Sequence, residues 1–150
     1  MRLKIPPLFV AFITCLLMYF LAFFLPFGSF DFTGKNYMMY FLLGLGGLVE
    51  GISLLQFFLK KTSINPIAPE NASALVVTGL YNFTRNPMYL GLLLLLLAWG
   101  LYLNNAFTIL IVAGFVSYMN RFQIKPEEEA LEKLFGATYR NYMIKVRRWF

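Results

Sequence analysis

The sequence predicts an all-α protein, a multi-pass transmembrane helical bundle of about four spans with a cytoplasmic amphipathic C-terminal helix. Of its 150 residues, 59% are hydrophobic and 13% are charged, and the mean hydropathy is +0.66. These values lie far outside the range of soluble domains. The apolar residues gather in runs that approach the roughly 20 residues needed to cross a bilayer. No low-complexity linker divides the chain, so a single domain over 1–150 is expected.

Four apolar segments are the expected spans, and they lie near 5–27, 37–59, 88–103 and 106–119. The first follows Arg2 and Lys4; it is too long for a signal peptide and has no small-residue cleavage site. The second is closed by Lys60 and Lys61. The last two segments are short for full spans, so whether this hairpin crosses completely stays open. The sequence therefore predicts two long spans followed by one apolar hairpin.

Polar connections separate these segments. The longest, over 60–87, contains the turn signals Asn65-Pro66, Pro69-Glu70 and Thr78-Gly79 and is expected to be a loop at the membrane surface. Pro87 suits the first turn of the third helix. Asn104-Asn105 marks the turn of the hairpin.

A different pattern begins in the C-terminal segment, 121–150. Pro126 stands at the expected start of an amphipathic helix, and the acidic run 127–129 suits its first turn, where the helix dipole favours anions. Leu131, Leu134, Phe135 and Tyr142 then recur at helical spacing. Gly136 is expected to interrupt this helix.

The positive charge predicts which side of the membrane each connection occupies. Of the 13 basic residues, all but Lys35 fall on the N-terminal side of the expected spans. Cytoplasmic loops carry such an excess of Lys and Arg. The expected localisation is therefore integral membrane and multi-pass, with both termini and the 60–87 loop in the cytoplasm.

Several function classes are excluded by residues that the chain lacks. It has no histidine, and Cys15 is its one cysteine. Disulfide frameworks, thiolate or imidazole metal sites, and Ser-His-Asp or Cys-His nucleophile systems therefore cannot be built, and no metal is expected. Nothing in the distribution of basic residues suggests nucleic-acid binding.

The residues that can do chemistry gather at the expected cytoplasmic face. Arg85, Glu127 and Glu128 lie on segments that the hairpin brings together, where they could bind a zwitterionic or cationic cofactor. A helix-start cluster of acids with an anchoring arginine explains them equally well. The tyrosines could stack on an adenine or face a sulfonium through cation–π attraction, although each could also belong to an interfacial aromatic belt. These are Tyr81, Tyr89, Tyr139 and Tyr142.

Two possible roles remain open for each of the other charged and small residues. Glu50 lies within the second span, where a carboxylate is costly; it could contact a polar substrate group, or be protonated and bonded to a neighbouring helix. Arg147 and Arg148 could grip a ligand carboxylate, or anchor the chain to lipid phosphates. Gly44, Gly47 and Gly51 share one helix face and permit close helix packing or a homodimer.

Taken together, these motifs resemble those of the isoprenylcysteine carboxyl methyltransferase and phospholipid methyltransferase group of integral membrane enzymes. The resemblance covers roughly the C-terminal half. It consists of Thr78-Gly79-Leu80-Tyr81, then R-x-P-x-Y-x-G from Arg85, an apolar hairpin, E-E-x-x-L-x-x-x-F-G-x-x-Y from Glu127, and the terminal basic pair. Each motif alone is weak, and their order and spacing make the resemblance specific.

The resemblance implies an S-adenosylmethionine-dependent methyltransferase whose lipophilic acceptor enters from the bilayer. The acceptor would be the carboxylate of a prenylated or other amphiphile, or a lipid head group. Asn86 stands where the family pattern often has histidine; it can offer a hydrogen bond but cannot take a proton at neutral pH. Arg85, Glu128 and Glu50 are the candidate catalytic residues. The candidate cofactor-binding residues are Tyr81, Arg85, Asn86, Pro87, Tyr89, Gly91, Glu127, Glu128, Tyr139, Arg147 and Arg148.

Methyl transfer also suits a chain without histidine. A carboxylate acceptor is anionic at pH 7 and needs no general base, whereas an amine or alcohol would have to lose its proton to Glu50, Glu127 or Glu128. Two other functions remain open. One is an NADPH-dependent membrane reductase of the sterol or steroid type, and the other is a non-catalytic membrane scaffold of the same fold.

Overall fold

A computed structural model describes residues 5–60 and 75–150. The described residues form helices and contain no strand, which confirms the all-α class. The expected signals at Arg2, Lys4, Lys61, Asn65-Pro66 and Pro69-Glu70 lie outside the described residues.

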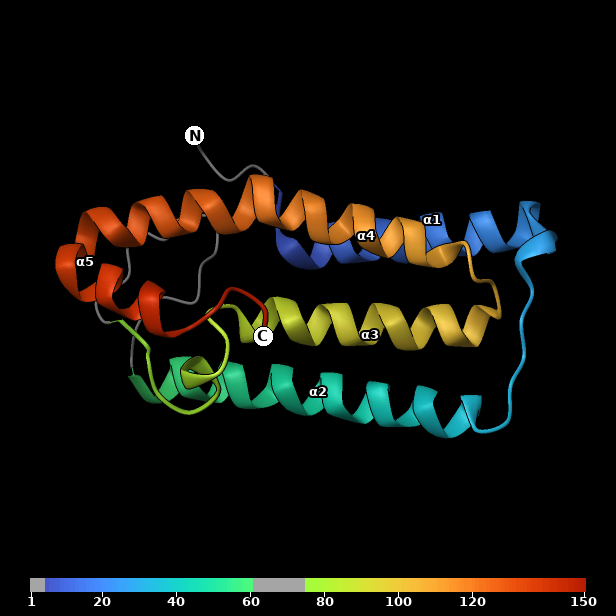
Figure 1. The fold of residues 1–150 in the computed structure, drawn as a ribbon, viewed down its shortest axis with the longest axis horizontal. Coiled ribbons are helices and arrows are strands. Elements are labelled where there is room, and N and C mark those ends of the chain that lie inside the picture. The colour runs from blue at the N-terminus through green and yellow to red at the C-terminus, as the bar shows by residue number, and fades with distance from the viewer. Residues whose placement is uncertain (1–4, 61–74) are drawn as a thin grey trace.

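The long helices follow the expected segments. They are α1 (Pro7–Phe24), α2 (Lys35–Lys60), α3 (Pro87–Leu103), α4 (Thr108–Met119) and α5 (Lys125–Lys145). Short 3₁₀ turns lie at Pro26–Gly28 and Gly79–Asn82, and a π-helical turn at Asn120–Ile124 joins α4 to α5. Figure 1 shows α3 between α2 on one side and the pair α1 and α4 on the other. The described part of the chain is therefore a layered bundle with α3 at its centre.

Two helices, α1 and α2, are long and apolar enough to cross a membrane. Their apolar windows, Pro7–Phe24 and Lys35–Gln56, are only 28% and 17% buried inside the structure. A core helix of a soluble protein would instead have most of its apolar surface covered. Exposure of so much apolar surface indicates that lipid covers these helices. The count of four spans is a prediction, because α3 is shorter than these two helices and α4 is shorter still.

The hairpin turn forms at Asn104 and Asn105, as the sequence predicts. Asn104 adopts the left-handed conformation with φ of 54° and ends α3, a position that asparagine tolerates better than most residues. Asn105 is buried, and its Nδ2 donates to the carbonyl of Leu25 at 2.7 Å. The Ala106 amide donates to the carbonyl of Gly28 at 2.8 Å. The hairpin tip is thus fastened to the end of α1.

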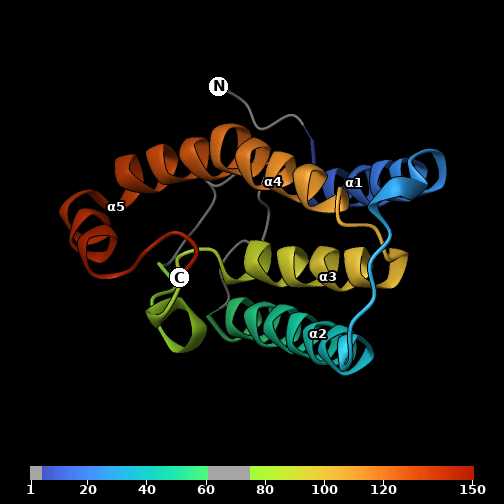
Figure 2. The ribbon, with the colours of Figure 1, turned by 45° about the vertical axis from the view of Figure 1, so that its right-hand side comes forward.

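Pro126 lies in the first turn of α5, as the sequence predicts, and Glu127 and Glu128 follow it there. The helix runs on from α4 through the π-helical turn into α5 (Figure 2). Proline removes one amide donor and crowds the carbonyl four residues before it, which disrupts a regular α-helix. A π-helical turn directly before Pro126 accommodates this misfit without ending the helix. The predicted interruption at Gly136 is confirmed, since that residue has φ of 51° and ψ of −124° inside α5.

Close packing between α2 and α3 depends on Gly46. A Cβ at Gly46 would lie 3.0 Å from the Leu95 side chain and 3.1 Å from the carbonyl oxygen of Gly91. The other glycines of α2 are exposed, and a Cβ on any of them would meet nothing within 4 Å; these are Gly44, Gly47 and Gly51. The homodimer through that outer face remains a prediction.

Candidate functional site

Glu128 is the centre of an ion-pair cluster between α5, the start of α3 and the C-terminal tail. Its Oε1 lies 2.8 Å from Nη2 of Arg85, and its Oε2 lies 2.6 Å from Nη2 of Arg148. Nε of Arg148 donates to Oε1 at 2.9 Å as well. The side chains of Glu128 and Arg85 are only 12% and 11% exposed. We call Arg85, Glu128 and Arg148 the arginine–glutamate cluster.

The C-terminal tail runs back along the segment before α3 and builds one wall of this cluster. The amide of Arg85 donates to the carbonyl of Arg147 at 2.9 Å. The carbonyl of Arg148 accepts from Thr84 Oγ1 at 2.9 Å and from Asn86 Nδ2 at 3.0 Å. Asn86 thus holds the tail through its side-chain amide, a role that needs no ionisable ring.

The two terminal arginines occupy different environments. Helix α5 ends at Val146, whose backbone is extended with φ of −122° and ψ of 132°. In the tail that follows, the side chain of Arg148 turns toward Glu128, whereas that of Arg147 is exposed. The hydrogen bonds to Glu128 raise the pKa of the Arg148 guanidinium. Arg147 joins the site through its backbone carbonyl.

A second acidic group, Glu127, lies beside this cluster. The hydroxyl of Tyr89, on the first turns of α3, donates to Oε1 of Glu127. Burial raises the pKa of the Glu127 carboxyl to about 8, against the lowering effect of the Tyr89 hydrogen bond. At neutral pH the carboxyl is therefore mostly protonated, and a nearby cation would draw the proton off.

Tyrosine side chains pack behind the acids. The hydroxyl of Tyr142 donates to the carbonyl of Tyr81 at 2.7 Å, and the rings of Tyr139 and Tyr142 lie 6.0 Å apart. Tyr81 and Tyr139 are buried, at 6% and 3% exposure. Burial raises the pKa of all three phenols, so they stay neutral. Neutral phenol rings can face a cation with their negative π surface.

Glu50 approaches the same region from α2. It packs against Gly91 of α3, two residues after Tyr89, and its buried Oε1 has no hydrogen-bond partner among the described residues. An unpaired buried carboxyl oxygen is costly, and such atoms gather at functional sites. Nε of Arg85 is the corresponding unpaired donor in the cluster. Within the described part of the chain, the site therefore offers an unpaired acceptor at Oε1 of Glu50 and an unpaired donor at Nε of Arg85.

The sequence motifs map onto this site as far as the described residues allow. Asn86 and Pro87 begin α3, and Gly91 has no side chain where Glu50 passes. The sequence did not predict a role for Trp149 in this site. Its Nε1 donates to Oδ1 of Asn120 at 3.0 Å and fastens the C-terminal tail next to Arg148. No pattern signals this bond, because the two residues are 29 positions apart and belong to no shared motif.

The contact between Gly91 and Glu50 gives a prediction about stability. A Cβ at Gly91 would lie 2.7 Å from Cγ of Glu50, so Gly91→Ala must push α2 and α3 apart or displace the carboxyl. We expect a loss of about 1–3 kcal/mol, the usual cost of overpacking. Thermal unfolding in detergent measures it.

Gly44→Ala is the matched control, since its Cβ would meet nothing within 4 Å. It should be neutral or stabilising by up to about 1 kcal/mol, because alanine favours helix. Equal unfolding temperatures for the two variants would show that Gly91 is not packed as described.

Comparison with known proteins identifies the family. Residues 38–138 match the family model described as phospholipid methyltransferase. An uncharacterized protein of Haemophilus influenzae is 55% identical over 62 residues, which make up 41% of this chain and 98% of that protein. No solved structure matches the chain. Since the matched region is well over half of the chain, the chain belongs to the phospholipid methyltransferase family and is a membrane methyltransferase.

Proposed function

We propose that the protein transfers a methyl group from S-adenosylmethionine to a membrane-resident lipophilic acceptor. The observation that carries this proposal is a pair of carboxyls that both act on Tyr89, Glu50 with its unpaired Oε1 and the half-buried Glu127, next to the arginine–glutamate cluster. S-adenosylmethionine would supply an electrophilic methyl group on a positively charged sulfonium. Two carboxyls and neutral tyrosine rings form a surface that suits such a cation.

Each residue type in the site then has a role. Arg85 and Arg148 both pair with Glu128, so Glu128 would position the two arginines rather than move a proton. The open Nε of Arg85 could hold a cofactor carboxylate. Glu127, Tyr89 and Tyr139 would line the cofactor pocket.

The remaining motif residues would shape this pocket. Asn86 and Pro87 fix the start of α3 and, through Arg148, the tail. Gly91 makes room for Glu50. Tyr81 accepts the Tyr142 hydrogen bond, and Arg147 contributes its carbonyl.

Glu50 and Glu127 also affect which methyl acceptor the site would favour. Both arginines of the cluster already face Glu128, while Glu50 and Glu127 would repel a second carboxylate when ionised. A lipid amine is protonated at neutral pH and must lose its proton before it can attack a methyl carbon. Glu50 or Glu127 could accept that proton. We therefore favour an amine head group over a carboxylate acceptor.

The proposed orientation in the membrane rests on the distribution of positive charge along the chain. We propose a multi-pass protein of about four spans with both termini and the site on the cytoplasmic side, as the Lys and Arg distribution indicates. A homodimer through Gly44, Gly47 and Gly51 would place the exposed face of α2 between two copies.

Transfer of a labelled methyl group tests this function. Purified protein in vesicles receives S-adenosylmethionine labelled on its methyl group, with phosphatidylethanolamine in one set and a prenylcysteine carboxylate in another. We expect label in the amine lipid, and Glu50→Gln should lower the rate at least tenfold. Label appearing in the prenylcysteine alone would contradict the choice of acceptor but not methyl transfer itself. Label in neither acceptor would contradict both the choice of acceptor and methyl transfer itself.

A further inference from the structure

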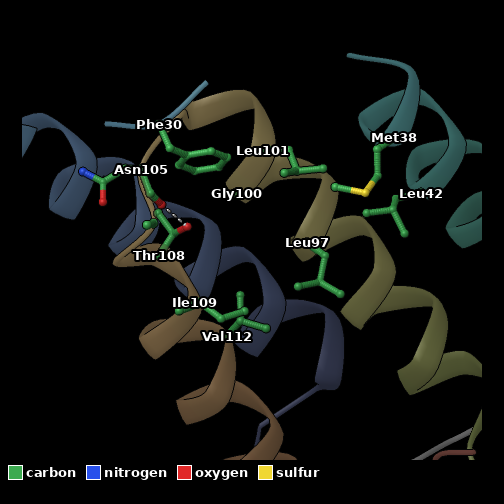
Figure 3. Close-up of a pocket in the computed structure, with 11 residues that line it drawn as sticks. Phe30, Met38, Leu42, Leu97, Gly100, Leu101, Asn105, Thr108, Ile109 and Val112 are labelled. Carbon is green, nitrogen blue, oxygen red and sulfur yellow. Dashed lines mark hydrogen bonds between the residues drawn. The ribbon is translucent and has the colours of Figure 1, made fainter. Parts of the chain in front are cut away.

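An apolar groove lies at the hairpin end of the bundle, far along α3 from the arginine–glutamate cluster. Its volume is about 490 Å³, within the range of roughly 300–1,000 Å³ that ligand pockets occupy. Figure 3 shows its walls, which come from α2, α3, α4 and the hairpin tip. The residues that line the groove include Phe30, Met38, Leu42, Leu97, Thr108 and Ile109.

The groove exists because α2 and α4 each pack on α3 and leave a space between themselves. Met38 on α2 and Ile109 on α4 form its flanks and are 42% and 53% exposed, so the groove opens outward between these helices. Phe30 lies above it, fixed by its amide, which donates to the carbonyl of Asn104 at 3.1 Å. The opening is therefore lateral, toward whatever surrounds the helices.

Among the described residues, the lining offers no free hydrogen-bonding side chain. Asn105 uses Nδ2 on the carbonyl of Leu25 and Oδ1 on the amide of Phe107. Thr108 donates to the carbonyl of Asn105 at 2.6 Å. The other lining side chains are aliphatic or aromatic, or a methionine. A polar ligand would lose its hydrogen bonds to water here and gain none, so the groove suits a hydrocarbon.

Close packing separates the groove from the candidate methyl-transfer site. Between them, Gly46 of α2 lies against Leu95 and the carbonyl of Gly91. Gly91 and Gly100 are also nine positions apart on α3, about 14 Å along a helix that rises 1.5 Å per residue. The groove can therefore be filled independently of the site.

We propose that this groove binds one hydrocarbon chain of a bilayer phospholipid, at a place distinct from the methyl-transfer site. The groove is continuous with the exposed apolar surface of α2, whose span is only 17% buried, through Met38, which lines it and is 42% exposed. The molecules that cover that surface are lipids, and their chains reach the lateral opening directly. A chain seated between Met38 and Ile109 fills the space that α2 and α4 leave open and supports α2 on a side where none of the described helices packs against it.

Adjacent leucines of α2 give a matched test. Leu42 lines the groove, whereas Leu43 is 51% exposed and does not line it. Leu42→Trp should fill the groove, and Leu43→Trp adds the same bulk outside it. Met38→Trp is a second filling variant from the groove's flank. Circular dichroism and thermal unfolding in detergent establish that each variant is folded.

The quantity measured is the amount of phospholipid that stays bound to each protein. Each protein is reconstituted in phosphatidylcholine vesicles, extracted with a mild detergent and analysed by native mass spectrometry. We expect wild type and Leu43→Trp to retain one phospholipid, and the folded filling variants to retain at least tenfold less. Equal retention by all four proteins would overturn the proposal, as would wild type that retains none. A protein dimer that is lost on filling would show instead that a second copy occupies the groove.

Discussion

Glu128→Gln should abolish S-adenosylmethionine binding and destabilise the protein by about 3 kcal/mol, the usual cost of breaking a buried ion pair. The reason is that the substitution leaves the guanidinium groups of Arg85 and Arg148 near each other without their carboxylate. Arg85 is only 11% exposed, so water cannot readily replace the lost partner. Thermal unfolding in detergent and a binding titration measure the two effects.

Glu132→Gln on the same helix is the matched control. Glu132 pairs with Arg140 at 3.3 Å, but these side chains are 40% and 59% exposed. Exposed pairs contribute about 0–1 kcal/mol, so this variant should bind and unfold almost as the parent does. If both variants behaved alike, the arginine–glutamate cluster would not be a buried centre of the site.

The second expected result is a strengthening of S-adenosylmethionine binding with pH. Without ligand the pKa of Glu127 is about 8, so the carboxyl is protonated at pH 7. A bound sulfonium favours the ionised carboxyl and lowers its pKa, so binding releases a proton. Affinity should therefore rise with pH, by up to about tenfold per pH unit, and level off above the unliganded pKa. Binding titrations at intervals of about one pH unit, between about pH 6 and pH 9, measure how the affinity changes with pH.

Removing the titrating group should flatten that dependence. Glu127→Gln keeps the size of the side chain and its ability to accept from Tyr89, but it cannot ionise. Its affinity should change little over the range in which the parent's affinity rises. Glu129→Gln is the control, because Glu129 is an exposed neighbour. An unaltered slope in Glu127→Gln would assign the pH dependence to a different group.

The bundle could be predicted from the sequence because its determinants are local. Apolar runs, flanking charges and the Asn104-Asn105 turn each act over a few residues. The same holds for the helix start at Pro87 and the kink at Gly136. The start of α5 at Pro126 was also predicted, but a local rule for proline could not show that a π-helical turn joins this helix to α4.

The details of the site depend on contacts between distant segments. Spacing could not tell which of Arg147 and Arg148 turns inward, because the path of the tail beside the start of α3 decides it. Nor could it separate the roles of Glu127 and Glu128, adjacent acids that meet Tyr89 and two arginines respectively. The close contact at Gly46 was missed for a similar reason, since only the position of α3 distinguishes it from the outer glycines of α2.

Calorimetric titration of the detergent-purified protein with S-adenosylmethionine, and with NADPH as the comparison, is the decisive test of the proposed methyl transfer. The two ligands separate a methyltransferase from a reductase that binds at the same face, and a scaffold would bind neither. We expect saturable binding of S-adenosylmethionine and none of NADPH. Absence of S-adenosylmethionine binding at millimolar concentration, or saturable binding of NADPH in its place, would contradict the proposed methyl transfer.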